Sequence, residues 1–357
     1  MRTVDAEKSS AQVHAQAGGA VVDRDRSWRA ALALAVRDPG RLAAVLGLDG
    51  AAAASLAADG AAEAARRFSV RVPLEMAARM RRGDPADPLL RQFAPAAEET
   101  AAVAGWGRDP LAEAAATPVP GLLHKYRGRV LLVLTGACPV HCRYCFRRHF
   151  PYGDHALGEE ALAAALAYVR ADASIHEVIL SGGDPLSLSD EALAALEARL
   201  AAIPHLRRLR LHTRWPIAVP SRVDTALLDW LGRSRLRPVV VVHCNHAAEI
   251  DGDVRAALGA LRARGIAVLN QSVLLRGVND SADALCELSE ALHDAGVVPY
   301  YLHLLDRVEG AAHFAVAERE ARRLVREMAD RLPGYLVPRL VREEAGGSAK
   351  TVLAPGP

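Results

Sequence analysis

The chain has 357 residues, 51% of them hydrophobic, which is enough to form one large globular domain with an additional N-terminal segment. Its 44 basic and 42 acidic residues are spread along the sequence and leave a net charge of +2, so the composition gives no sign of a nucleic-acid partner or of a membrane-binding surface. Because the first 25 residues lack the apolar stretch of a signal peptide and no later run has the length of a membrane span, we expect a cytoplasmic protein.

Two residue types have an unusual distribution. Three of the five cysteines lie between Cys138 and Cys145, whereas a secreted disulfide framework has an even number of cysteines spread along the chain. Such a group of thiols in a reducing compartment indicates a metal site. Among the 44 basic residues only Lys8, Lys125 and Lys350 are lysines. Arginine cannot form a Schiff base, because its guanidinium does not deprotonate in proteins, so a retained lysine indicates either a need for its amine or chance.

The sequence divides into four parts in chain order. Residues 1–25 mix Gly, Ser, Ala and charged residues without a period, which predicts a disordered tail. Residues 26–120 are predicted to form a mainly helical N-terminal extension, because Ala and Leu recur at helical spacing from Trp28 to Arg82. Residues 121–332 are predicted to form a barrel-like α/β domain, and residues 333–357 a C-terminal segment that carries Lys350.

Short β-rich segments alternate with amphipathic segments after Gly128. The predicted strands are 129–135, 177–181, 208–213, 238–243, 267–272 and 298–304. The predicted helices are 159–170, 190–202, 225–232, 253–264, 281–295 and 318–331. Strands that recur about every 30 residues with helices between them indicate right-handed βα units in a parallel sheet.

Polar residues follow four of these strands at the point where each strand ends. The segments are Ser181-Gly182-Gly183-Asp184, His212-Thr213-Arg214, His243-Cys244-Asn245-His246 and Asn270-Gln271-Ser272. This one-ended placement favours a partial (β/α)6 TIM-like barrel whose site lies at the C-terminal mouth. A doubly wound sheet and a helical solenoid are the alternatives, and the apolar strands argue against the solenoid.

The clustered cysteines follow the first predicted barrel strand as Cys138, Cys142 and Cys145, with the spacing Cys-x3-Cys-x2-Cys. A structural zinc ion normally takes four ligands in two pairs, and only the isolated Cys244 and Cys286 are left to complete such a set. A four-iron cluster held by three thiolates instead keeps one iron open for a further ligand.

The cysteine spacing, with an aromatic residue directly before the last cysteine, resembles the motif of the radical S-adenosylmethionine (SAM) superfamily. The resemblance implies a 4Fe–4S cluster whose open iron binds SAM. When an external electron donor has reduced the cluster, SAM would be cleaved to methionine and a 5′-deoxyadenosyl radical. Structural zinc is the alternative.

Two further segments place small residues beside groups that could bind a ligand. Ser181-Gly182-Gly183 resembles the glycine-rich element that holds the SAM amino group in this superfamily, although a plain tight turn could have the same sequence. Lys350 follows a loop of small residues, and a lysine amine can form an imine with an aldehyde cofactor. A solvated lysine in a frayed terminus is the alternative.

Taken together, these motifs resemble the lysine 2,3-aminomutase family, and within it the short bacterial branch that makes (R)-β-lysine for attachment to translation elongation factor P. The resemblance extends from about Arg71 to Lys350. The segments that carry it are 87–92, 121–127, 145–152, 243–246, 270–280 and 299–303.

The resemblance implies a role for each matching residue. The cluster ligands would be Cys138, Cys142 and Cys145. Pyridoxal phosphate would be held as a Schiff base by Lys350 and contacted by Lys125, Tyr126 and Arg129. The residues that would contact SAM are Ser181, Gly182, Gly183, His243 and Gln271. The substrate carboxylate would pair with Arg147, whose guanidinium is suited to bidentate binding.

Two carboxylates match positions that receive the ε-ammonium group of lysine. A relative acting on glutamate would be expected to have a cation at the position of Asp306, so this residue favours a basic substrate. Glu343 stands where the family has an aspartate, seven residues before Lys350. The charge is retained, but the reach of the side chain differs.

The resemblance thus implies an isomerase that converts L-α-lysine to (R)-β-lysine by 1,2-migration of the amino group. Its product would serve a lysyl-tRNA-synthetase-like ligase that modifies elongation factor P. Two alternatives remain: the same reaction on another amino acid or in lysine catabolism, and a structural zinc or nucleic-acid module. Catabolic members continue into a zinc segment that helps to assemble the oligomer, whereas this chain stops seven residues after Lys350. We therefore expect no zinc and a smaller or looser homo-oligomer.

Overall fold

The computed structural model of the chain describes residues 27–155 and 157–356. The tail predicted for residues 1–25 lies outside the described residues. Within the described ranges nine strands form one mixed sheet, in which the strands are neighbours in sequence order from β1 to β9. The seven parallel strands are β2 (Arg129–Thr135), β3 (Glu177–Gly182), β4 (Arg208–Thr213), β5 (Arg237–Val242), β6 (Ala267–Val273), β7 (Val298–His303) and β8 (Arg339–Arg342). At the two edges, β1 (Leu122–Tyr126) and β9 (Thr351–Val352) are antiparallel to their neighbours.

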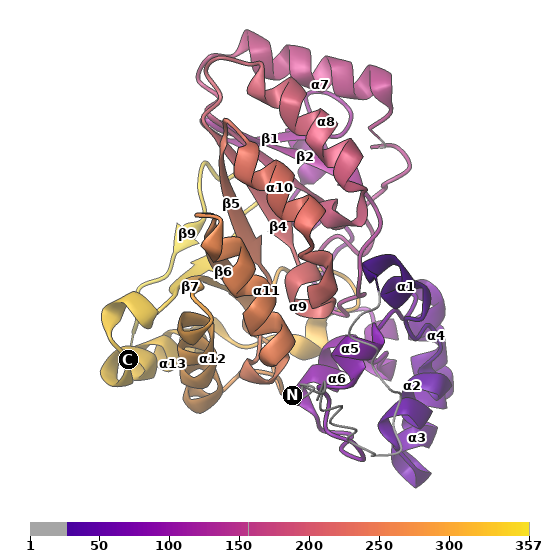
Figure 1. Cartoon of the computed structure of the whole chain (residues 1–357). Coiled ribbons are helices and arrows are strands. Elements are labelled where there is room, and N and C mark those ends of the chain that lie inside the picture. The colour runs from indigo at the N-terminus through magenta and orange to yellow at the C-terminus, as the bar shows by residue number, and fades with distance from the viewer. Residues whose placement is uncertain (1–26, 156, 357) are drawn as a thin grey trace, which may run out of the picture.

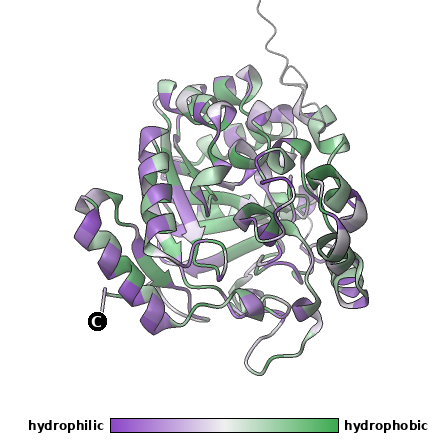
Figure 2. Cartoon of the chain, turned by 90° about the horizontal axis from the view of Figure 1, so that it is seen from below, coloured by the Kyte–Doolittle hydropathy of each residue, from purple (hydrophilic) through white to green (hydrophobic). Residues whose placement is uncertain are grey.

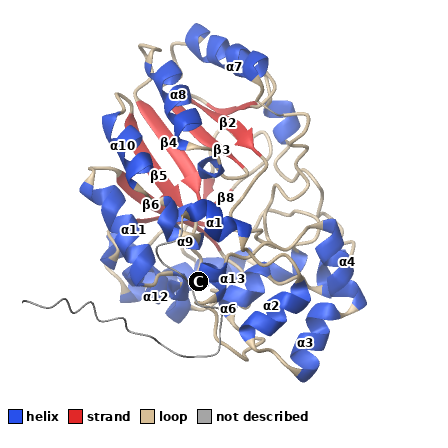
Figure 3. Cartoon of the chain, turned by 45° about the vertical axis from the view of Figure 1, so that its right-hand side comes forward, coloured by secondary structure: helices blue, strands red, loops and turns tan. Residues whose placement is uncertain are grey.

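Helices that connect the parallel strands lie along the outer face of the sheet (Figures 1 and 3). They are α7 (Glu159–Ala171), α8 (Asp190–Ala201), α9 (Trp215–Ala218), α10 (Thr225–Arg233), α11 (Gly252–Ala263), α12 (Ala282–Asp294) and α13 (Glu318–Arg331). Four of them begin after a side chain that accepts a hydrogen bond from a first-turn N–H, namely Ser189, Asp224, Asp251 and Ser281. The six predicted strands and six predicted helices agree with these elements to within one residue at each end. The predicted partial (β/α)6 barrel is confirmed as the fold class.

Three strands were not expected from the sequence pattern. β8 has four residues and β9 only two, so neither is long enough to display a period. β1 has five residues, of which three are polar or aromatic, and pairs with β2 across a tight turn. Their strand conformation is stabilised by pairing with neighbouring strands, which a local pattern does not report.

The N-terminal extension is helical in its first part only. Its α-helices are α1 (Trp28–Ala33), α2 (Pro39–Leu46), α3 (Gly50–Ala57), α4 (Asp59–Arg67), α5 (Leu74–Ala77) and α6 (Pro88–Phe93). The 3-10 helices of the described residues are η1 (Ala97–Thr100), η2 (Glu113–Ala116), η3 (Pro185–Ser187), η4 (Pro220–Arg222), η5 (Ala247–Glu249), η6 (Ala312–Phe314) and η7 (Gly334–Leu336). Between Phe93 and β1 the chain therefore runs mainly through turns, η1 and η2.

The N-terminal helices and the barrel share one hydrophobic core. Buried apolar side chains of α1, α2, α5 and α6 belong to the same cluster as those of β2 to β5 and their helices. At the junction the Trp28 ring packs edge-on against Trp215, with 5.1 Å between ring centroids, and the Arg222 guanidinium lies 4.8 Å from the Trp28 ring. Figure 2 shows mostly hydrophobic strands in the middle, surrounded by helices that mix hydrophilic and hydrophobic residues. In the described part of the chain, none of the helices combines the length and hydropathy that a membrane span requires.

A buried ion cluster joins the extension to the cysteine-bearing loop. The carboxylate of Glu99 accepts hydrogen bonds from Arg143 at 2.8 and 2.6 Å and from Arg148 at 2.7 Å. All three side chains are at most 2% exposed. The remaining donors of Arg143 bond to the carbonyl oxygens of Phe68 and Ala64. Each charged group in this cluster therefore contacts a group of opposite charge, as burial demands.

Replacement of Glu99 by alanine is expected to lower the free energy of unfolding by about 3–5 kcal/mol, because it leaves two buried guanidinium groups without their counter-charge. Urea unfolding followed by circular dichroism measures the change. The matched control is Glu63→Ala, which removes a solvent-exposed carboxylate that also pairs with two arginines, Arg66 and Arg67. We expect the control to unfold at nearly the wild-type urea concentration, since exposed ion pairs contribute little. Equal losses in the two variants would contradict the structural role of Glu99.

Candidate active site

A cavity of about 560 Å³ lies at the carboxyl ends of the parallel strands. Because these ends point the same way, the polar segments that follow them face one space. Every site residue predicted from the sequence lines this cavity. They are Cys138, Cys142, Cys145, Ser181, Gly182, Gly183, His243, Gln271, Lys125, Tyr126, Arg129, Arg147, Asp306, Glu343 and Lys350.

The three clustered cysteines lie close enough to shift one another's pKa values by electrostatic repulsion. Burial and the charge of Cys142 raise the pKa of the Cys145 thiol to about 11. Burial also raises the pKa of Cys138, with further contributions from Asp184, Cys145 and Cys142. Thiolates that repel one another in this way are stabilised by a positively charged metal centre.

The donor set of the loop fits an iron–sulfur cluster. The three cysteines are free thiols that face the cavity. Among the residues that the structure describes, no three His, Cys, Asp or Glu side chains are placed to bind one metal ion together. In a four-iron cluster each thiolate binds a different iron atom, so the three sulfurs need not converge on one point.

The glycine pair after β3 packs directly against the start of the cysteine loop. Gly182 has φ +116°, and a Cβ atom there would lie 2.7 Å from the carbonyl oxygen of Thr135. A Cβ at Gly183 would lie 2.5 Å from the carbonyl oxygen of Ala137. Backbone hydrogen bonds from Gly183 to Thr135 (2.6 Å) and from Asp184 to Ala137 (2.8 Å) hold the two loops together. The glycines are thus required for close packing of the loops, whichever ligand they contact.

Arg147 is held by a carboxylate that the sequence did not single out. Its Nε and Nη2 donate to Glu113 at 2.8 and 2.9 Å, and its Nη1 donates to Ser181 Oγ and the carbonyl oxygen of Gly182. Lys125 Nζ lies 3.1 Å from Glu113 as well. Although burial acts to raise it, the pKa of Glu113 is lowered by Arg147 and Lys125, so the carboxylate stays ionised.

Lys350 lies in the cavity and forms an ion pair with Glu343. The other oxygen of Glu343 is 3.1 Å from Lys125 Nζ. Burial acts to raise the pKa of Glu343, but Lys350 and Lys125 lower it well below its ordinary value. Beside this pair, the Arg129 guanidinium lies 4.6 Å from the ring of Tyr126. One end of the cavity is therefore lined by three cations.

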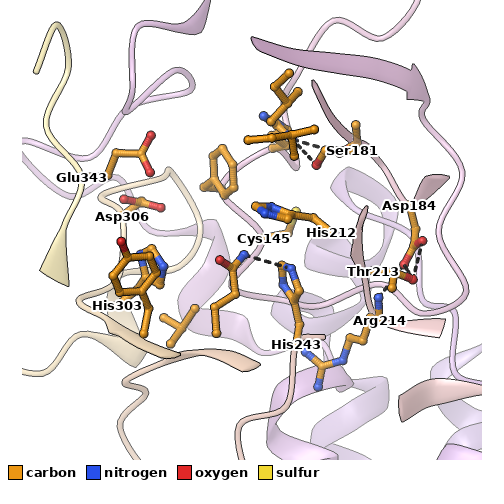
Figure 4. Close-up of a pocket in the computed structure, with 18 of the residues that line it drawn as sticks. Cys145, Ser181, Asp184, His212, Thr213, Arg214, His243, His303, Asp306 and Glu343 are labelled. Carbon is orange, nitrogen blue, oxygen red and sulfur yellow. Dashed lines mark hydrogen bonds between the residues drawn. The ribbon is translucent and has the colours of Figure 1, made fainter. Parts of the chain in front are cut away.

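Asp306 and Glu343 approach each other from different elements, with both carboxylates facing the cavity (Figure 4). The pKa of Asp306 is raised to about 7 by burial and by the negative charge of Glu343, although Lys350 and Lys125 act in the opposite direction. Glu343 is already engaged by two lysines. Asp306 is therefore the carboxylate whose charge a cationic ligand would stabilise most.

Neutral imidazoles occupy the middle of the cavity (Figure 4). Burial lowers the pKa of both His243 and His303 to about 3, so neither carries a charge near pH 7. His243 Nε2 lies 3.0 Å from Gln271 Nε2, which makes this ring nitrogen the acceptor. The SAM-facing pair predicted from the sequence thus forms one hydrogen-bonded unit.

Glu113 and Arg214 are among the cavity residues that were not assigned a role from the sequence. Glu113 lies in η2, more than 30 residues before Arg147, and no local motif links the two. Arg214 belongs to a polar segment at a strand end, and this position was the only feature of the sequence that could have indicated a role in the cavity. Its side chain reaches Cys142 Sγ at 3.5 Å.

Comparison with known proteins places the chain in a family. The model of the radical SAM superfamily matches residues 132–219. The chain is 48% identical over 326 residues to L-lysine 2,3-aminomutase of Escherichia coli (strain K12), covering 91% of this chain and 94% of that protein. It is 37% identical over 274 residues to L-lysine 2,3-aminomutase of Clostridium subterminale, covering 76% of this chain and 65% of that protein.

Among solved structures, a radical SAM methyltransferase from Sphaerobacter thermophilus is 18% identical, with a TM-score of 0.44 over 62% of this chain and 68% of the methyltransferase chain. The sequence relatives alone decide the family, since the first of them is matched along nearly its whole length. They confirm the resemblance drawn from the motifs: the chain belongs to the lysine 2,3-aminomutase family of radical SAM enzymes.

Proposed function

We propose that this protein is the isomerase that converts L-α-lysine to (R)-β-lysine by moving the amino group from the α to the β carbon. The cofactors of the reaction are a 4Fe–4S cluster, SAM and pyridoxal phosphate. One observation carries the proposal: a single cavity has three clustered thiols at one side and Lys350, among further cations and Asp306, at the other. The relatives named L-lysine 2,3-aminomutase support the substrate and the reaction.

The cofactors supply the two capabilities that amino-acid side chains lack, namely a radical able to remove hydrogen from an unactivated carbon and a π system that accepts the migrating nitrogen. Cys138, Cys142 and Cys145 would hold the cluster. His243 and Gln271 lie in the same cavity and would bind SAM together with the backbone at Gly182 and Gly183. The neutral state of His243 leaves its ring free to exchange hydrogen bonds without adding a charge near the radical.

The cationic end of the cavity is suited to an aldehyde cofactor that carries a phosphate. Lys350 provides the amine, while Lys125 and Arg129 provide positive charge for the phosphate. Glu343 pairs with both lysines in the described structure, so it offsets part of their positive charge before the cofactor binds. The amine of Lys350 must leave this ion pair to form a bond with the cofactor.

Arg147 and Asp306 would bind the two ends of the substrate. Glu113 occupies the Nε–Nη2 edge of Arg147. Nη1 now donates to Ser181 and Gly182, and it could donate to the substrate carboxylate in their place. Asp306 would receive the ε-ammonium group. A cation there offsets the repulsion between Asp306 and Glu343, which is why the site favours lysine over an acidic amino acid.

We propose further that the β-lysine is attached to elongation factor P by a lysyl-tRNA-synthetase-like ligase. Support comes from the match to 94% of the length of the Escherichia coli relative, against 65% of the clostridial one, since the resemblance drawn from the motifs implies that the short branch serves this modification. Free thiols and a reducible cluster suit the cytoplasm, where an external electron donor is available. A homo-oligomer remains part of the proposal.

Anaerobic incubation of the reconstituted, dithionite-reduced protein with SAM, pyridoxal phosphate and L-lysine is expected to give β-lysine, detected by chiral chromatography. Cys142→Ala should lose the reaction because a cluster ligand is gone, and Lys350→Ala should lose it because the cofactor amine is gone. Cys286→Ala is the control, since this buried thiol on α12 lies outside the cavity. Full activity in Cys142→Ala, or SAM cleavage without β-lysine in the wild type, would contradict the proposal.

Asp306→Asn is expected to raise KM for lysine by about 10- to 100-fold, corresponding to about 1.5–3 kcal/mol for a hydrogen bond to a charged group. In the wild type the affinity for lysine should fall as the pH drops below about 7, because the pKa of Asp306 lies near 7 and only the ionised carboxylate pairs with the ammonium group.

Steady-state kinetics between pH 6 and 8.5, at saturating cofactors, check both effects. The asparagine variant should lose this part of the pH dependence. Asp330→Asn, which neutralises an exposed aspartate on α13, serves as the charge-matched control. An unchanged KM in Asp306→Asn would remove Asp306 from the substrate site.

A further inference from the structure

Arg214 is a buried cation in direct contact with one of the clustered thiols. It follows β4 directly, and its side chain is 7% exposed. Its Nη1 donates to Cys142 Sγ at 3.5 Å and to the hydroxyl of Tyr144, two residues further along the cysteine loop. Figure 4 shows Arg214 beside Asp184, which accepts a hydrogen bond from the Arg214 backbone N–H. Both the backbone and the side chain of Arg214 are therefore anchored.

The partners of the second terminal nitrogen fix the direction of this side chain. Nη2 donates to Glu249 at 2.7 Å and to Gln92 at 2.9 Å. Both partners are fully buried. Glu249 is in turn held by Gln92 Nε2 at 3.1 Å and by the backbone N–H of Asn245 at 2.9 Å. A guanidinium fixed on one side in this way presents its other side to the sulfur in a constant geometry.

We propose that Arg214 raises the reduction potential of the iron–sulfur cluster by donating a hydrogen bond and placing a positive charge at Cys142. The inference rests on the proposed function, because it requires that Cys142 is a cluster ligand. Reduction adds one electron from the external donor and makes the cluster more negative. A donor and a cation at a ligand sulfur stabilise the more negative state, which eases reduction.

The positive charge of Arg214 and the negative charge of Glu249 act on the reduction potential in opposite directions, and their positions decide which effect is larger. Nη1 of Arg214 contacts the sulfur, whereas Glu249 lies beyond the guanidinium and contacts Nη2. The positive charge is therefore nearer to the Cys142 sulfur than the negative one. Since Coulomb energy falls with distance, the nearer charge dominates. Glu249 offsets the cost of burying Arg214 and reduces its effect on the cluster only in part.

The test is an EPR-monitored redox titration of the reconstituted protein under anaerobic conditions without SAM. Arg214→Met/Glu249→Gln removes the donor and the charge without leaving Glu249 as an unpaired buried carboxylate. We expect the reduction equilibrium of this variant to be at least tenfold less favourable, which for one electron is a potential about 59 mV lower. Arg214→Lys keeps the charge but cannot reach Cys142, Gln92 and Glu249 together, so it should shift the potential in the same direction by less.

The matched control is Arg222→Met/Asp190→Asn. This pair is also largely buried, with 3.1 Å between Arg222 Nη2 and Asp190, but neither residue lines the cavity. Its loss should lower stability and leave the potential unchanged.

Iron and sulfide analysis separates failure of the inference from failure of the proposed function. A wild-type potential in Arg214→Met/Glu249→Gln, or equal shifts in the two double variants, would overturn the role of Arg214 while the cluster assignment stands. A wild-type protein that assembles no cluster under reconstitution would overturn both.

Discussion

The buried ion cluster of Glu99, Arg143 and Arg148 is the constraint on which the cysteine loop depends. Three residues with opposite charges are taken out of water, and such a group is tolerated only when every charge has its partner. The loop also donates a backbone hydrogen bond to the N-terminal extension: His141 N–H bonds to the carbonyl oxygen of Arg71 at 3.0 Å. Arg71 Nη1 in turn donates to the carbonyl oxygen of Cys138. The extension therefore holds the cysteine loop in place from outside the cavity. Loss of its contacts would let the three thiols change their relative positions.

The other end of the cavity is organised by charges that alternate along a chain. Arg147 pairs with Glu113, Glu113 with Lys125, Lys125 with Glu343, and Glu343 with Lys350. Three cations and two anions leave this chain of pairs with a net charge of +1, which suits the phosphate of the proposed cofactor. Each carboxylate is shared by two cations. A ligand that withdrew Lys350 from Glu343 would leave Lys125 as the remaining cation on that carboxylate.

Local features of the sequence were sufficient for the barrel and for the cysteines. Cys138, Cys142 and Cys145 lie within eight residues of one another, and the apolar strands can be recognised from their own composition. Glu113 and Arg214 could not be assigned in this way. Glu113 acts on Arg147 across 34 positions and Arg214 on Cys142 across 72, and each pairing exists only after the strands have aligned. β8 and β9 were not predicted for the same reason. Their strand conformation depends on pairing with neighbouring strands and not on a pattern in their own short sequences.

These contacts explain what a glutamate can do at position 343, where the family has an aspartate. The longer side chain sends one oxygen to Lys125 and the other to Lys350. Both oxygens are occupied by cations of the protein while Lys350 stays in its ion pair, and release of Lys350 would free one of them for a cation of the substrate. Asp306 has the opposite situation, because its pKa is raised to about 7 by burial and by the charge of Glu343. Glu343 thus offsets part of the positive charge of the two lysines, and its own negative charge acts on Asp306, the carboxylate proposed to receive the ammonium group.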